Sequence, residues 1–345
     1  MTKKLFFILA TLTLVLANTG LYSQKTAGNY LESIGKEFNS IQQKSWQYTR
    51  AAAHGKSARK VDNNRRQLVT SINLAINRIQ GMNDFEGNTR LRDSALSFLK
   101  VHHAVINEDY AKLMDMEEIS EQSYDAMEAY MLAREKANEK LYQAGAMVDK
   151  EYSKFAADHN IQLIQSESKL SKNMEIANKV YDHYNDVYLV FFKSYKQEAY
   201  LLTAMDKSDV NGIEQNKNAL IKTSAEGIQK LKTLTAYEND QSIKKACTEM
   251  LEFYNEEASK KMVDLAAFYV AKDNFEKIKS SFDAKTPDKR TPTDFDQYNA
   301  AVNDYNAASN NFNKVNQELN NKRNSLIQNW NNSTERFTDK HVPDN

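Results

Sequence analysis

The feature that most constrains this chain is an internal repeat. Residues 57–115 match residues 209–267 at a constant offset of 152, without a gap. A repeat of this length fixes the architecture before any other consideration, so we expect two helical units in tandem. What repeats is apolar spacing and helix-cap chemistry, with no catalytic constellation among the matched positions. Representative pairs are Leu68/Leu220, Ile76/Ile228, Leu99/Leu251, Leu113/Leu265 and the N-cap positions Ser57/Asp209.

Backbone breakers are rare in this sequence, which has 9 Gly and 3 Pro among 345 residues. Helix formers are common, and apolar residues recur at intervals of three and four, so the fold class is all-α. We expect two tandem antiparallel four-helix-bundle-like units, built from long coiled-coil-like helices. The predicted helices lie near 27–53, 57–81, 88–113 and 120–170 in the first unit, and near 173–206, 209–235, 239–282 and 293–337 in the second. The fourth helix is capped by Ser120 or Ser123, and a break near Gly145 or His159-Asn160 is an alternative to one continuous helix.

The first residues predict export. Lys3 and Lys4 are followed by an uncharged, mostly apolar run over 5–17, which is too short to span a bilayer as a helix. We therefore assign residues 1–23 to a secretory signal peptide cleaved after Ser23, with a cut nearer Ala17 or Gly20 as the alternative. No second apolar run of membrane length follows. The expected organisation is helical unit 1 over 24–170, helical unit 2 over 171–341 and a disordered tail over 342–345.

Charge and cysteine content limit the function classes. The chain has 46 basic and 46 acidic side chains, which argues against a nucleic-acid binder. Cys247 is the only cysteine, so an exported chain of this kind cannot form an internal disulfide. Its counterpart in the repeat is Ala95, which indicates a small buried core position rather than a reactive thiol.

Sequence motifs for catalysis or metal binding are missing. The chain has no Glu-x-x-His, Cys-x-x-Cys-His, His-Glu-x-x-His, Gly-x-Ser-x-Gly or Gly-rich phosphate loop. We therefore predict that the protein is not an enzyme and has no cofactor. If a metal binds, the candidates are His102, His103 and His183. Because Tyr254 is the counterpart of His102, an aromatic core side chain is the better interpretation of that histidine.

The last helix has an apolar pattern of its own, which alternates by three and four residues from Phe295 to Phe337. Ser309, Asn316 and Arg323 interrupt this coiled-coil-like seam. One interpretation is a helix docked on its own bundle. The other is a homotypic or partner-binding seam, whose candidate residues are Tyr298, Tyr305, Phe312 and Trp330.

The signal peptide ending at Ser23-Gln24, the Tyr- and Asn-rich long helices and the lack of a catalytic motif together resemble an uncharacterised family of bacterial all-helical exported "surface proteins". The resemblance implies a location in the periplasm or at the cell surface of a Gram-negative type of bacterium. The leading hypothesis is a non-enzymatic structural or interaction protein with a protein or surface-polymer partner. The alternative is a periplasmic bundle that binds a small ligand or metal between its helices. The sequence leaves the oligomeric state open.

Overall fold

The computed structural model describes residues 26–54, 57–110, 119–163 and 168–344. The expected signal peptide lies outside these residues. The described chain is all-α, as predicted, and the isolated β-bridges Phe85–Asn88 and Tyr237–Asp240 lie in loops between helices. None of its helices has a stretch long and apolar enough to cross a membrane. The chain divides into two compact units, of which unit 1 comprises residues 1–183 and 335–345, and unit 2 comprises residues 184–334.

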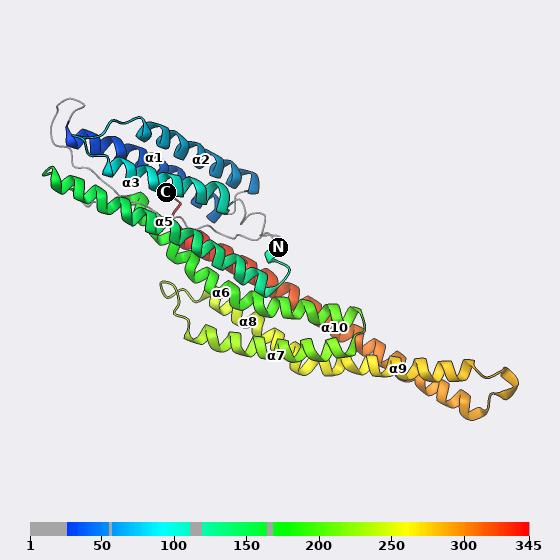
Figure 1. Cartoon of the computed structure of the whole chain (residues 1–345). Helices are drawn as coiled ribbons and strands as arrows, with labels where there is room; N and C mark the ends of the chain where they lie inside the picture. Colours follow the sequence, from blue (N-terminus) through cyan, green and yellow to red (C-terminus); the bar gives the residue numbers. More distant parts are fainter. Residues whose placement is uncertain (1–25, 55–56, 111–118, 164–167, 345) are drawn as a thin grey trace. The chain divides into compact units, whose positions relative to one another are not determined.

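Unit 1 is an assembly of long helices that lie side by side (Figure 1). Helix α1 packs on α2, α2 on α3, and α3 on α5. The Thr26 side chain caps α1 by accepting from the amide of Asn29, and the Ser123 side chain caps α5 by accepting from the amide of Ala126. The elements are α1 (Ala27–Ala53), α2 (Ala58–Gln80), α3 (Arg90–Ala104), the π-helical turn η1 (Val105–Asp109) and α5 (Tyr124–Asp158).

Unit 2 takes the second part of α6 (Lys169–Asp206) and most of α10 (Pro292–His341). Between them lie α7 (Val210–Thr233), α8 (Ser242–Glu256), the π-helical turn η2 (Glu257–Lys261), α9 (Met262–Asp283) and the short 3₁₀ turn η3 (Pro287–Lys289). Asp209 caps α7 by accepting from the amide of Gly212. The apolar part of α6 forms the core of this unit, where Val187, Phe191 and Phe192 are all buried.

Helix α9 and residues 292–319 of α10 form a two-helix hairpin, which we call the aromatic hairpin (Figure 1). Each helix contributes one aromatic ring every seven residues, and the rings meet in antiparallel register. At its turn, Lys285 pairs with Asp294 at 2.6 Å. The three ring pairs, with their centroid distances, are Phe282/Tyr298 at 4.7 Å, Phe275/Tyr305 at 5.2 Å and Phe268/Phe312 at 4.7 Å.

Local structure recurs at the sequence offset of 152. Helix α8 and turn η2 have the bounds of α3 and η1 shifted by that number. The loops before them match as well, because the bridge between Phe85 and Asn88 has its counterpart between Tyr237 and Asp240. Within these loops Glu86 and Glu238 both have positive φ, of 53° and 46°. The repeated sequence therefore encodes the same turn and the same change of helix type in both units.

Two expectations about boundaries differ from the structure. The compact units divide inside α6, at residues 183/184, rather than at 170/171. A continuous helix of 38 residues hides such a boundary, because no loop marks it in the sequence. The tail predicted to be disordered is partly packed: Val342 is buried, and Arg50 Nη1 donates to the carbonyl oxygen of Asp344 at 2.7 Å.

Candidate functional site: two π-helical turns and a buried charged cluster

The two π-helical turns are the least regular parts of otherwise regular helices. A π-turn inserts an extra residue into an α-helix, and such turns are frequent at functional sites. Turn η1 follows α3 in unit 1, and η2 follows α8 in unit 2. Their surroundings are therefore the first places to look for chemistry.

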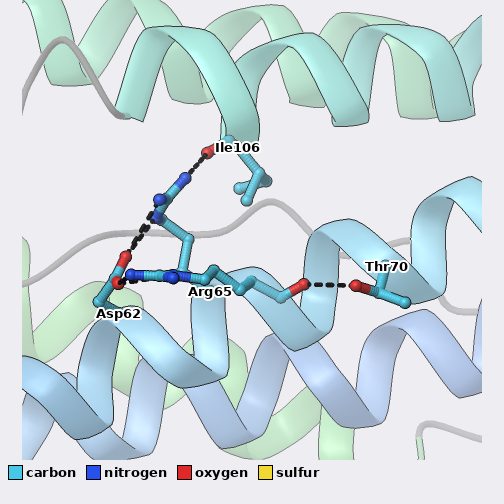
Figure 2. Close-up of polar contacts among 5 residues, drawn as sticks. Asp62, Arg65, Thr70 and Ile106 are labelled. Atoms are coloured by element: carbon cyan, nitrogen blue, oxygen red, sulfur yellow. Dashed lines mark hydrogen bonds and ion pairs between the residues drawn. The ribbon is translucent and has the colours of Figure 1, made fainter.

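In unit 1, a side chain of α2 reaches the π-turn. Arg65 Nη1 donates to the carbonyl oxygen of Ile106 at 3.3 Å, as Figure 2 shows. The Asp62 carboxylate orients this guanidinium, since Oδ1 accepts from Arg65 Nη2 at 3.0 Å, and it also pairs with Arg66. The hydrogen bond from Arg66 and the pair with Arg65 hold the pKa of Asp62 below its usual range, although burial opposes them. Asp62 is therefore ionised at neutral pH and keeps Arg65 aimed at η1.

The same unit buries Arg134 of α5 among tyrosines. The guanidinium carbon lies 5.7 Å from the ring centroid of Tyr130. Burial raises the pKa values of Tyr48 and Tyr110, and the Arg134 charge acts in the opposite direction on both. The Tyr110 hydroxyl, one residue past η1, lies 2.5 Å from Asn138 Oδ1 and donates to it. Near η1, the Arg134 guanidinium therefore lies against tyrosine side chains.

In unit 2, the corresponding turn carries a buried charged cluster. The Arg323 guanidinium of α10 donates from Nε to Glu198 of α6 and from Nη2 to Glu257, the first residue of η2. It donates from Nη1 to the side chain of Asn320, one turn earlier in α10. Glu198, Glu257 and Arg323 are 2 %, 1 % and 7 % exposed. One guanidinium therefore ties three helical elements together out of contact with water.

The electrostatics of this cluster are unbalanced, because two carboxylates face one guanidinium. Burial raises the pKa of Glu257 to about 8; repulsion from Glu198 adds to this, and Arg323 opposes it. Burial likewise raises the pKa of Glu198, again against the attraction of Arg323. Burial lowers the pKa of Arg323, but the two carboxylates together raise it by more, so Arg323 stays a cation. Two interacting carboxyl groups of this kind titrate as a pair.

Comparison of the two turns shows where the units differ. Position 105 of unit 1 is a buried Val, whereas position 257 of unit 2 is a buried Glu. His102 and Tyr254 occupy matching positions one turn earlier, and both are buried. Burial, together with the Glu198 charge, raises the pKa of Tyr254. The backbone is thus the same at both turns, whereas the first residue of the turn is a buried Val in unit 1 and a buried Glu in unit 2.

The three candidate histidines lie in unit 1. His102 is buried against Phe98, with ring centroids 5.5 Å apart, and its ring nitrogens have no hydrogen-bond partner among the described residues. Burial, with a contribution from His103, lowers its pKa to about 4. His183 packs on Phe337 at 5.7 Å. Within the described parts of the chain, these histidines belong to no group of three or more His, Cys, Asp or Glu residues that could hold a metal ion.

The candidate seam residues of the last helix pack within the chain. Tyr298, Tyr305 and Phe312 face the phenylalanines of α9 in the aromatic hairpin, as described above. Trp330 is buried and stacks on Phe191 of α6, with ring centroids 4.5 Å apart. At these four positions the last helix therefore contacts other helices of its own chain, with Trp330 buried and the other three rings half-buried.

The single cysteine is part of the core. Cys247 and its counterpart Ala95 are both fully buried, and the Cys247 thiol lies 3.9 Å from the carbonyl oxygen of Val187. Burial raises the pKa of this thiol, so it is present as the unreactive thiol form at neutral pH.

In the sequence, Arg323 stands out only as an interruption of the seam. Glu198 and Glu257 do not stand out as candidate site residues. A usable signal was present in the repeat, where Glu257 is aligned with Val105. An acidic residue at a core position of one copy requires a buried partner, and Arg323 is a basic residue at a core position of another helix. Pairing the two would have predicted the ion pair.

Comparisons with known proteins add no identification. No protein-family model matches the chain, and no match was found among the curated proteins or among the solved structures.

Proposed function

We propose that this chain is an exported, non-enzymatic helical protein of the bacterial cell envelope or surface, which binds a protein or surface-polymer partner through the aromatic hairpin. The cationic start and apolar run within residues 1–23, a pattern typical of signal peptides, support the location. The matching turns and helix bounds in the two units support an origin by internal duplication. On this view the function lies where the units differ, and the aromatic hairpin belongs to unit 2 alone.

The observation that carries the proposal is the incomplete burial of the hairpin. Two helices cannot enclose their own seam, so its six paired aromatic rings are only half-buried. On the flank of α9, Val263 and Val270 are 66 % and 70 % exposed, and they lie two turns apart on one face of the helix. Phe295 near the hairpin turn is also exposed. Exposed apolar side chains gathered beside an aromatic seam are typical of interaction surfaces.

Site-specific crosslinking tests this proposal. A photo-crosslinking amino acid is placed at Val263 or Val270 and, as a control, at Tyr142, an equally exposed position of unit 1. Irradiation of intact cells is expected to give a defined crosslinked species from the first two positions and not from the third. The same species from all three positions, or none from the hairpin, would contradict the proposal. Protease treatment of intact cells before lysis separates a surface location from a periplasmic one.

The alternative function, a bundle that binds a small ligand or metal, is favoured by one observation, the burial of the His102 ring without a hydrogen-bond partner among the described residues. Purified protein that melts at a higher temperature on addition of divalent metals or haem, with the shift lost in His102→Phe, would support it. Unchanged melting would exclude it.

A further inference from the structure

The buried charged cluster of unit 2 contains two carboxyl groups and only one guanidinium. Glu198 and Glu257 both contact Arg323, and all three side chains are almost fully buried. With both carboxylates ionised, the cluster would carry a net charge of about −1 in a medium of low dielectric constant, which is costly. With one proton on the pair, the cluster is neutral.

The remaining groups around Glu257 do not supply a second positive charge. The pKa of Glu257 is governed by burial, by Glu198 of α6 and by Arg323 of α10. Tyr254 of α8 is neutral at physiological pH. Glu256 pairs with Lys322 at 2.9 Å on the exposed side. Helix α7 packs against η2, and Asn255 of α8, two residues before Glu257, donates from Nδ2 to Ser224 Oγ of α7 at 3.1 Å. Lys260 and Lys261 belong to η2 itself, but Lys260 is exposed and Lys261 is half-buried, so neither is enclosed with Glu257.

One atom of the cluster is left for a proton. Glu257 Oε1 accepts from Arg323, whereas Glu257 Oε2 is buried and has no hydrogen-bond partner among the described residues. A buried ionised oxygen without a donor is expensive, and protonation removes its charge.

We propose that Glu198, Glu257 and Arg323 form a proton-locked clamp, in which one proton held by the two carboxyl groups at neutral pH keeps α10 attached to α6 and to the π-turn η2. When the proton leaves to solvent, the cluster gains a negative charge inside the unit. The π-turn, with its extra residue, is the part of the α8–α9 helix that can move Glu257 towards water. Alkaline pH therefore loosens residues 320–330 of α10.

The sign of the pH dependence follows from the raised pKa of Glu257, about 8 in the folded protein against 4.5 unperturbed. Between these two pKa values the folded state retains a proton that the unfolded chain has lost. The stabilisation that this proton provides is therefore complete below the unfolded pKa of 4.5. The stabilisation falls as pH rises and is gone above about pH 8. Between these values the opening equilibrium constant rises by up to about tenfold per pH unit.

Infrared spectroscopy tests the proton directly on the intact protein. Wild type at pH 7 is expected to show the carbonyl stretch of a protonated carboxylic acid, which disappears as pH is raised past about 8. All of these proteins carry Asp149→Asn, because burial raises the pKa of Asp149 to about 6 and its own acid band would overlap. Glu257→Gln should lack the band, and Glu256→Gln, which changes the exposed neighbouring carboxylate, should keep it. Absence of the band in wild type, or its persistence in Glu257→Gln, would overturn the proposal.

Hydrogen exchange tests the clamp. After correction for the chemical exchange rate, amides of residues 320–330 should open more readily at pH 8 than at pH 6 in wild type and in Glu256→Gln. In Glu257→Gln, whose side chain is a neutral copy of the protonated acid, this dependence should be lost. If the band titrates but exchange of wild type is the same at both pH values, the cluster holds a proton without acting as a clamp, and the proposal is wrong.

Discussion

Arg65 Nη1 donates to the carbonyl oxygen of Ile106 at 3.3 Å, so a side chain of α2 holds the backbone of the π-turn η1. Replacing Arg65 by Met should leave this carbonyl without that donor and destabilise the protein by about 1–3 kcal/mol. Urea unfolding measures the change. The matched control is Arg66→Met, because Arg66 pairs with the same Asp62 but is largely exposed, and we expect a loss of about 0–1 kcal/mol. Equal losses in the two variants would show that the contact with η1 is not what matters.

His102 should make unit 1 sensitive to acid. Because burial, with His103, lowers its pKa to about 4 from 6.5, the unfolded chain takes up a proton that the folded unit refuses. The contribution of neutral His102 to the free energy of unfolding is therefore fully present above about pH 6.5. It is lost as pH falls towards 4, by up to about 3 kcal/mol. His102→Phe should flatten the unfolding free energy over this range. If wild type and variant show the same slope between pH 6.5 and 4, the histidine is not responsible.

Arg323 should be essential only while its two acidic partners are present. Arg323→Met leaves two buried carboxylates without their cation and should cost about 3–5 kcal/mol. Replacing all three charged residues together, as Glu198→Met, Glu257→Leu and Arg323→Met, should restore stability to about the wild-type value or above it. Thermal melting of wild type, the single variant and the triple variant compares these outcomes. A triple variant as unstable as the single Arg323 variant would mean that the cluster stabilises unit 2 by itself.

Gly227 is the position of α7 at which the unit 2 core has no room. A Cβ there would lie 2.9 Å from Leu251 Cδ1 and 3.0 Å from Val190 Cγ1. Gly227→Ala should therefore destabilise the protein by about 1–3 kcal/mol, despite the higher helix propensity of Ala. At Gly28 the nearest neighbour of such a Cβ is 4.0 Å away. Gly28→Ala is expected to be neutral or stabilising, and destabilisation of both variants to the same extent in urea would refute the packing argument.

The regular parts of the fold could be predicted from the sequence because helix signals are local. The predicted first helix has the observed bounds of α1, 27–53, and the predicted stop of the second at Gly81 is the C-cap of α2, which ends at Gln80. Apolar periodicity between clear stop residues is enough to place such elements. The all-α class follows from the same signals.

The π-turns and the charged cluster could not be predicted in the same way. A π-turn shifts the helical phase by a single residue, which is within the error of a periodicity argument, so the helices around η1 and η2 were expected to be uninterrupted. Glu198 and Arg323 are 125 residues apart in the sequence, and only the folded helices bring them together. The sequence shows the spacing of Tyr298, Tyr305 and Phe312. That these rings pack on the phenylalanines of α9 depends on the hairpin, which only the folded chain forms.

The last residues of the chain complete its first compact unit. Residues 335–345 belong to unit 1, where His54 Nδ1 lies 3.2 Å from Asp339 Oδ1 across 285 residues of sequence. Contacts of such long sequence separation are slow to form, because the intervening chain must be ordered first. During synthesis, unit 1 therefore emerges early but stays unfinished until residues 335–345 have followed. The surface of unit 1 that these residues cover therefore stays open throughout the synthesis of unit 2.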